Sequence, residues 1–160
     1  MLRRWPPRAL PNGTTAYVVE NPSLIAEAAA RGWTGPPLVC SFGRPSVAVV
    51  TLLRRLASEG AQLRQHADFD HAGIGITAWL ADRAGTIPWR MSAADYVEGT
   101  ARLRSAHRHS AAIPETPWDP TLQLEMSRCG VAVYEEEVRD ELLAAILASP
   151  RSHQADRATP

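Results

Sequence analysis

Short apolar runs alternate along the chain with segments whose apolar residues recur at helical spacing, and this alternation constrains the fold most. The apolar runs cover residues 15–19, 36–41, 61–67 and 86–91, and each precedes a predicted helix. Helices of about 12 residues between strands are long enough to carry the chain back across a sheet, so that successive strands run parallel. We therefore predict an α/β fold with a mostly parallel four-stranded sheet flanked by helices.

Residue types that begin helices support this assignment. Asn21 followed by Pro22 is typical of a helix start, because Asn caps unpaired N–H groups and Pro fits the first turn. Ser92 and Asp119 are predicted to cap two later helices. Residues 134–148 predict an amphipathic helix, which extends the domain at its C-terminal side.

We expect one domain over residues 14–149, between a flexible tail over 1–13 and a disordered tail over 150–160. Residues 101–120 have little apolar periodicity and are predicted to include an exposed loop. No apolar run approaches the roughly 18 residues of a membrane-spanning helix, so no membrane contact is expected. The first residues also lack the apolar stretch of a secretory signal, and a cytoplasmic location is therefore expected.

Three acidic residues follow predicted strands. Glu20 comes after the first strand, and Asp68 and Asp70 come after the third. The carboxyl ends of parallel strands lie at one edge of a sheet, where ligands bind in such folds. Residues two apart in an extended segment point the same way, so Asp68 and Asp70 can face one spot. Three carboxylates there would repel one another without a cation, and their hard oxygens suit Mg²⁺, with Mn²⁺ as an alternative.

The two aspartates also have an ordinary structural interpretation. Asp70 is well placed to cap the helix that starts near Ala72, and Asp68 could brace the turn before it. Taken alone, the Asp-Phe-Asp sequence favours this interpretation. Glu20 shifts the balance toward a metal site, because a charged residue between an apolar strand and an Asn-Pro helix start has no evident packing role.

Glu after the first strand and Asp-x-Asp after the third is the arrangement of the Toprim (topoisomerase–primase) domain, which this chain resembles. The likeness is carried by VVENPSLIAEAA, PPLVCSFGRPSVAVVTLL, LRQHADFDHAGIGIT and PWRMSAADY. These stretches resemble the Toprim-like C-terminal domain of a bacterial family that is similar to the nuclease subunit of Wadjet-type plasmid-defence systems. More distantly, they are similar to the topoisomerase VI A subunit. The likeness covers residues 15–148 and implies a Toprim/Rossmann-like α/β fold.

The resemblance implies a Mg²⁺-dependent nuclease that cleaves DNA, with Glu20, Asp68 and Asp70 as catalytic residues and metal ligands. It also implies condensin-like defence subunits as partners. Two features depart from the family pattern: Ala67 stands where Gly is usual, and the large N-terminal region that normally precedes this domain is missing. A separate N-terminal DNA-binding region is therefore a further possible partner. A catalytically inactive remnant that binds a partner or DNA is the alternative.

Further residues are candidates for binding phosphate. Ser41 and Arg44 lie at the end of the second strand, where Arg44 could clamp a phosphate group. By alternation His66 shares a side with Asp68, and it could contact phosphate or transfer a proton. A surface arginine and a structural histidine are the alternatives for Arg44 and His66.

The 17 acidic and 17 basic residues balance, so no general positive field indicates nucleic-acid binding. One basic cluster could still follow a DNA backbone, with a solvated loop as the alternative. The cluster contains Arg102, Arg104 and Arg108.

Overall fold

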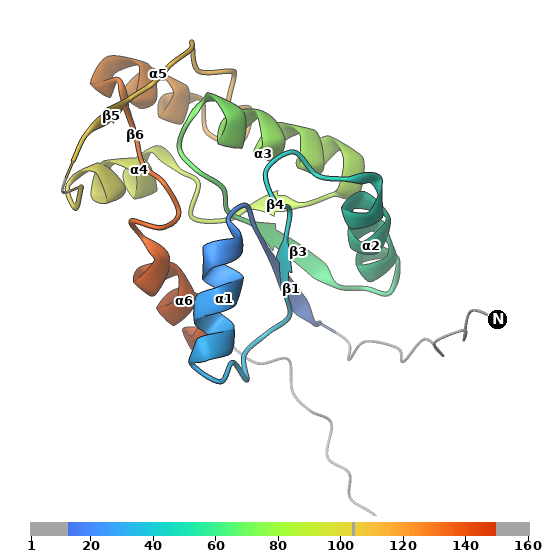
Figure 1. The fold of residues 1–160 in the computed structure, drawn as a ribbon. Coiled ribbons are helices and arrows are strands. Elements are labelled where there is room, and N and C mark those ends of the chain that lie inside the picture. The colour runs from blue at the N-terminus through green and yellow to red at the C-terminus, as the bar shows by residue number, and fades with distance from the viewer. Residues whose placement is uncertain (1–12, 104, 150–160) are drawn as a thin grey trace, which may run out of the picture.

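The computed structural model describes residues 13–103 and 105–149. Its main sheet has the strand order β2-β1-β3-β4, and every neighbouring pair is parallel (Figure 1). The strands are β1 (Thr15–Val19), β2 (Leu38–Cys40), β3 (Gln62–Gln65) and β4 (Ile87–Pro88). The α/β fold that the sequence predicts is confirmed.

Helices connect the strands and continue the chain beyond the sheet. They are α1 (Pro22–Ala30), α2 (Val47–Ser58), α3 (His71–Ala84), α4 (Ala93–Thr100), α5 (Pro120–Cys129) and α6 (Arg139–Ala148). Figure 1 shows α1 and α6 side by side on one side of the sheet, with α2 and α3 on the other. No helix among the described residues is long and apolar enough to cross a membrane.

The side chains of β1 alternate between two buried clusters, as expected for a strand that is covered on both faces. Ala16 and Val18 pack in the cluster that α2 and α3 supply, which includes Leu53 and Leu80. Val19 belongs instead to the larger cluster that contains Leu24 of α1 and Leu142 of α6. Both layers therefore fix β1 in place, and with it the residue that follows the strand.

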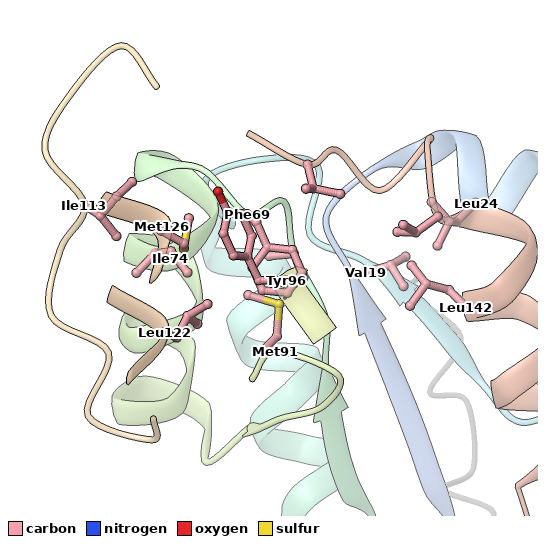
Figure 2. Close-up of a cluster of buried hydrophobic side chains, with 13 residues drawn as sticks. Val19, Leu24, Phe69, Ile74, Met91, Tyr96, Ile113, Leu122, Met126 and Leu142 are labelled. Carbon is pink, nitrogen blue, oxygen red and sulfur yellow. Dashed lines mark hydrogen bonds between the residues drawn. The ribbon is translucent and has the colours of Figure 1, made fainter. Parts of the chain in front are cut away.

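The larger cluster continues under the loop after β3. Phe69 is 2% exposed, and its ring centre lies 5.5 Å from that of Tyr96 in α4 (Figure 2). The N–H of Phe69 also donates to the carbonyl of Val133 at 2.8 Å. Phe69 thus anchors the middle of the Asp-Phe-Asp segment in the core, which fixes the backbone on either side of it.

The predicted helix caps are confirmed. The Asn21 side chain accepts a hydrogen bond from the N–H of Ser23, and the Asp119 side chain accepts one from the N–H of Thr121. Ser92 forms a capping box with Asp95, in which each side chain bonds the other residue's N–H. These helix starts are specified locally, which is why the sequence alone indicates them.

The C-terminal third differs from the prediction at the start of its last helix. The helix predicted over residues 134–148 begins only at Arg139, because the carboxylate of Glu135 is drawn into the sheet edge and that of Glu137 bonds the N–H of Tyr134. The segment over residues 101–120 is mostly exposed and irregular, as predicted, and it also contains the short strand β5 (His107–Arg108), which pairs antiparallel with β6 (Val131–Ala132). Apart from Gly13, the predicted tails lie outside the described residues.

Candidate functional site

The carboxyl ends of β1 and β3 lie side by side, because these two strands are direct neighbours in the sheet. Glu20 follows β1 immediately, and Asp68 lies in the segment just beyond β3. The N–H of Asp68 donates to Oε2 of Glu20 at 3.2 Å. The structure therefore brings together two of the three acidic residues that the sequence places at this edge, through a direct hydrogen bond.

A fourth acidic residue, Glu135, links these elements from the segment before α6. Its carboxylate is fully buried and accepts hydrogen bonds from the N–H groups of Glu20 at 3.1 Å and Asn21 at 2.6 Å. Its own N–H donates to Oδ1 of Asp68 at 2.7 Å. Glu135 thus holds the end of β1 and the segment after β3 in fixed positions relative to each other.

Glu135 is not among the site residues that the sequence predicts, because residues 134–148 are predicted to form one amphipathic helix. A usable signal was present, because Glu135 follows the apolar stretch Val131–Tyr134 just as Glu20 follows β1. A charged residue directly after a short apolar run again indicates the end of a strand rather than the start of a helix.

Burial and mutual repulsion raise the pKa values of the two central carboxyl groups. The pKa of Glu20 rises to about 7, mainly through burial and then through the charges of Glu135 and Asp70, against the opposing hydrogen bond from Asp68. Burial likewise raises the pKa of Asp68 to about 8, with the charges of Glu20 and Glu135 adding to it. The cluster therefore carries more negative charge than its surroundings stabilise, which favours a cation or a proton there.

Asp70 caps α3, as its structural interpretation predicts. Its Oδ1 accepts a hydrogen bond from the N–H of Gly73 at 2.7 Å. The charge of Asp70 also contributes to the raised pKa values of Glu20 and Asp68, so it acts on the same cluster. Asp70 is thus a helix cap that leaves one carboxylate oxygen outside this hydrogen bond.

Gly73 lets the start of α3 approach the Asp-Phe-Asp segment closely. A Cβ atom built on Gly73 would overlap the carbonyl oxygen of Asp68, a backbone atom that has no freedom to rotate away. Only glycine fits this contact. Gly75, one half-turn further along α3, meets open space instead. Gly73 therefore sets the distance between the α3 start and Asp68.

The donor types of this cluster fit a hard cation such as Mg²⁺, since all of them are carboxylate oxygens. Glu20 and Asp68 each use one oxygen for a backbone N–H and keep the other outside any hydrogen bond within the described chain. In residues 13–103 and 105–149 no group of three or more His, Cys, Asp or Glu residues is arranged to hold a metal. The carboxylate oxygens are therefore the ligand type that Mg²⁺ prefers. In the described structure, however, these side chains do not surround one common point.

A cavity of about 360 Å³ opens next to Glu20, between the turn before α2 and the first turns of α3. Its polar lining residues are Glu20, Arg44 and His71. Its apolar wall includes Ile76 and Trp79. The turn that carries Arg44 is tied to the site, because the N–H of Gly43 donates to the Glu20 carbonyl at 3.4 Å. Arg44 therefore lies at the same cavity as Glu20, where the sequence placed a phosphate clamp.

A family model described as "Protein of unknown function C-terminus (DUF2399)" matches residues 1–146 of the chain. The chain belongs to the DUF2399 family. No curated protein matches the chain with significance. The match covers every acidic residue of the cluster, so the cluster lies within the part of this DUF2399 chain that defines the family.

Two of the predicted phosphate-binding residues are occupied by internal contacts in this DUF2399 domain. Ser41 is 3% exposed, and its hydroxyl donates to the Val19 carbonyl at 3.3 Å. His66 is 2% exposed, and its Nδ1 lies 3.1 Å from Oε1 of Glu135. His66 thus lies behind the carboxyl cluster and supports Glu135, while Ser41 stabilises the sheet edge.

The predicted basic cluster is divided by its contacts. Arg102 forms ion pairs with Glu98 at 2.5 Å and with Glu141 at 2.8 Å, so its charge is already compensated. Arg108 lies on β5 and is exposed. Arg104 lies outside the described residues. Of the two described arginines, only Arg108 of this DUF2399 domain has a side chain without an acidic partner in the described structure.

Proposed function

We propose that this domain is a Mg²⁺-dependent, Toprim-type nuclease that cleaves phosphodiester bonds in DNA. The observation that carries the proposal is the hydrogen bond between the N–H of Asp68 and the carboxylate of Glu20, which brings the ends of β1 and β3 together. The likeness of the ENP, GRPS and HxDFD sequences to Toprim domains supports the same assignment. We further propose that the domain works in a Wadjet-like anti-plasmid complex, beside condensin-like subunits.

Glu20, Asp68 and Asp70 would hold the metal, through the oxygens that the backbone hydrogen bonds leave available. Bound Mg²⁺, or Mn²⁺ in its place, would supply charge stabilisation for the phosphate oxygens during hydrolysis. The buried Glu135 would not touch DNA. Its role would be to fix Glu20 and Asp68 relative to each other, and it is therefore a positioning residue.

Glu20 would either complete the set of metal ligands or act as a general base toward the attacking water. As a general base, Glu20 would take a proton from the attacking water, whose oxygen forms the new bond to phosphorus while the bond to one ester oxygen breaks. The departing oxygen would take up a proton from solvent and become the hydroxyl end. Arg44, which lines the same cavity, would bind a non-bridging oxygen of this phosphate. Chain cleavage would leave one phosphate-terminated and one hydroxyl-terminated end.

One observation favours the alternative, a catalytically inactive domain that binds DNA or a partner. Asp68 and Asp70 already accept hydrogen bonds from backbone N–H groups, and Asp70 has a full structural role as a helix cap. The same residues could therefore serve the fold alone. The two proposals predict different effects of replacing a carboxylate by the amide of the same shape. A nuclease should lose cleavage, whereas an inactive binding domain has no cleavage to lose.

A plasmid-cleavage assay with Mg²⁺ or Mn²⁺ separates them. The protein is incubated with supercoiled plasmid, alone and with candidate partner subunits, and nicked and linear products are followed with time. We expect metal-dependent cleavage that Glu20→Gln and Asp68→Asn reduce at least about 100-fold. Glu115→Gln, which changes an exposed acid that makes no contact with the cluster, is the matched control. Full activity in Glu20→Gln and Asp68→Asn would contradict the nuclease proposal.

A further inference from the structure

The cavity beside Glu20 is too large and too apolar to serve a phosphate group alone. Its volume of about 360 Å³ lies in the range of sites for small organic ligands. Glu20, Arg44 and His71 supply polar groups, whereas the wall from α3 includes Ile76 and Trp79. A ligand that fills this space therefore combines an anionic part with an apolar surface.

Arg44 supplies the charge for the anionic part. Its guanidinium makes no ion pair and no hydrogen bond within the described chain, although Arg44 borders the cavity. Arg55 of the neighbouring α2, by contrast, pairs with Glu59. The turn before α2 carries Arg44 at the cavity, and Arg44 pairs there with no acidic residue of the described structure. An anion in the cavity would thus meet an arginine that has no acidic partner among the described residues.

Trp79 supplies a surface for the apolar part. It contributes to the cavity wall and is still 36% exposed, so its indole is not used up in core packing. An accessible aromatic ring that lines the same cavity as an arginine is typical of sites that stack nucleobases, because every base has a flat face. Ile76 precedes Trp79 by about one turn of α3 and extends the apolar wall.

We propose that this cavity receives one unpaired nucleotide of a DNA strand, with its base against Trp79 and Ile76 and its phosphate on Arg44. The inference rests on the proposed nuclease function and names its substrate as single-stranded or locally unpaired DNA. A base within a duplex must leave the stack before it can enter a pocket, which costs free energy. The domain should therefore bind single strands more tightly than an intact duplex.

Fluorescence anisotropy in EDTA measures this binding without cleavage. Three labelled probes are compared, namely a single-stranded oligonucleotide, a blunt duplex of the same sequence, and a single strand with abasic sites in place of its bases. We expect the intact single strand to bind about tenfold more tightly than either other probe. Equal affinity for the intact and abasic strands would overturn the proposal, because it would show that no base is bound.

Gly75→Leu provides the sharpest variant. A side chain on Gly75 projects into open space and would fill the cavity, and a leucine there also favours the helix. Asp82→Leu adds the same side chain to an exposed position of α3 outside the cavity and is the control. We expect Gly75→Leu to lower affinity for the intact strand to the abasic level and Asp82→Leu to leave it unchanged. Unchanged affinity in Gly75→Leu would overturn the proposal.

Two further variants keep the test decisive if Gly75→Leu does not fold. Trp79→Ala should abolish the difference between intact and abasic strands, whereas Arg44→Gln should weaken both equally. A Trp79→Ala protein that still discriminates the two strands would overturn the proposal.

Failure of the pocket and failure of the nuclease give different results. Base-dependent binding without any Mg²⁺-dependent cleavage would contradict the nuclease function and leave the pocket standing. Mg²⁺-dependent cleavage together with equal binding of intact and abasic strands would contradict the pocket alone.

Discussion

The backbone N–H of Glu135 donates to Oδ1 of Asp68 at 2.7 Å, across 67 positions of sequence. The Glu135 carboxylate in turn accepts from the N–H groups of Glu20 and Asn21. One buried residue thus joins the segment before α6 to the ends of two neighbouring strands. The acidic cluster depends on this long-range link as much as on the sheet itself.

Removal of the Glu135 carboxylate should destabilise the fold. Glu135→Ala leaves two backbone N–H groups and His66 without their acceptor in a buried place, which should cost about 2–4 kcal/mol of unfolding free energy. Urea unfolding followed by circular dichroism measures the change. Glu115→Ala, at an exposed position, should change the unfolding free energy little. Equal stability of the two variants would contradict the role assigned to Glu135.

The two glycines at the start of α3 should respond in opposite ways to alanine. Gly73→Ala drives a Cβ into the Asp68 carbonyl and should cost about 1–3 kcal/mol, as overpacking does. Gly75→Ala meets open space and should stabilise the helix by about 0.5–1 kcal/mol. Thermal unfolding of the pair measures both effects. Similar melting temperatures for the two variants would show that Asp68 does not approach α3 closely.

Local sequence signals explain how much of this structure could be predicted. Asn21, Ser92 and Asp119 cap their helices through neighbouring N–H groups, so short sequences suffice to identify them. The sequence predicts that Glu20 can reach Asp68 only if their strands are neighbours, and the structure supplies this by pairing β1 with β3. Glu135 could not be placed in this way, because its contacts are with residues distant in sequence and its own segment is rich in acidic residues that favour a helix start.

The pairing of β5 with β6 was missed for a related reason. Each of these strands has only two residues, which is too short for a periodic pattern. Their pairing joins residues on either side of α5, and Val133 then reaches Phe69. The Asp-Phe-Asp segment therefore depends on a partner strand that is distant in sequence, and no local signal shows that the two segments pair.

The raised pKa values predict that stability falls with rising pH when no divalent cation is present. Glu20 and Asp68 titrate near 7 and 8 when folded, against ordinary values of 4.5 and 3.8. Between these limits the folded state binds more protons than the unfolded state, so the unfolding free energy decreases as pH rises. The contribution of the protonated Glu20 and Asp68 to the unfolding free energy is fully present below about pH 4. It is lost as pH rises through about 7 to 8.

Urea midpoints in EDTA at about pH 5 and about pH 8 test this for wild type and Asp68→Asn. Asp68→Asn cannot ionise, and its stability relative to wild type should therefore be greater at the higher pH. A pH-independent difference between the two proteins would contradict the raised pKa of Asp68.

Arg44 should contribute to DNA affinity without contributing to stability. Arg44→Gln removes a guanidinium that has no acidic partner in the described structure, so it should weaken single-strand binding and lower the salt slope by about 1. Anisotropy titrations at several salt concentrations measure the slope. Arg55→Gln, which removes an arginine paired with Glu59 on α2, is the control and should leave the slope unchanged. Identical slopes for wild type and Arg44→Gln would exclude a phosphate contact at this residue.

The proposed cation site at Glu20, Asp68 and Asp70 is tested most directly by electron paramagnetic resonance of Mn²⁺. The signal of free Mn²⁺ is titrated with the full chain at about pH 8, where Glu20 is largely ionised and Asp68 is partly ionised, so that little proton release opposes metal binding. We predict saturable binding at submillimolar to millimolar Mn²⁺, competition by Mg²⁺, and a loss of about tenfold or more in affinity in Glu20→Gln and in Asp68→Asn. The Glu115→Gln control should bind as wild type does. Wild-type affinity in both cluster variants, or no binding by the wild-type protein, would contradict the cation site.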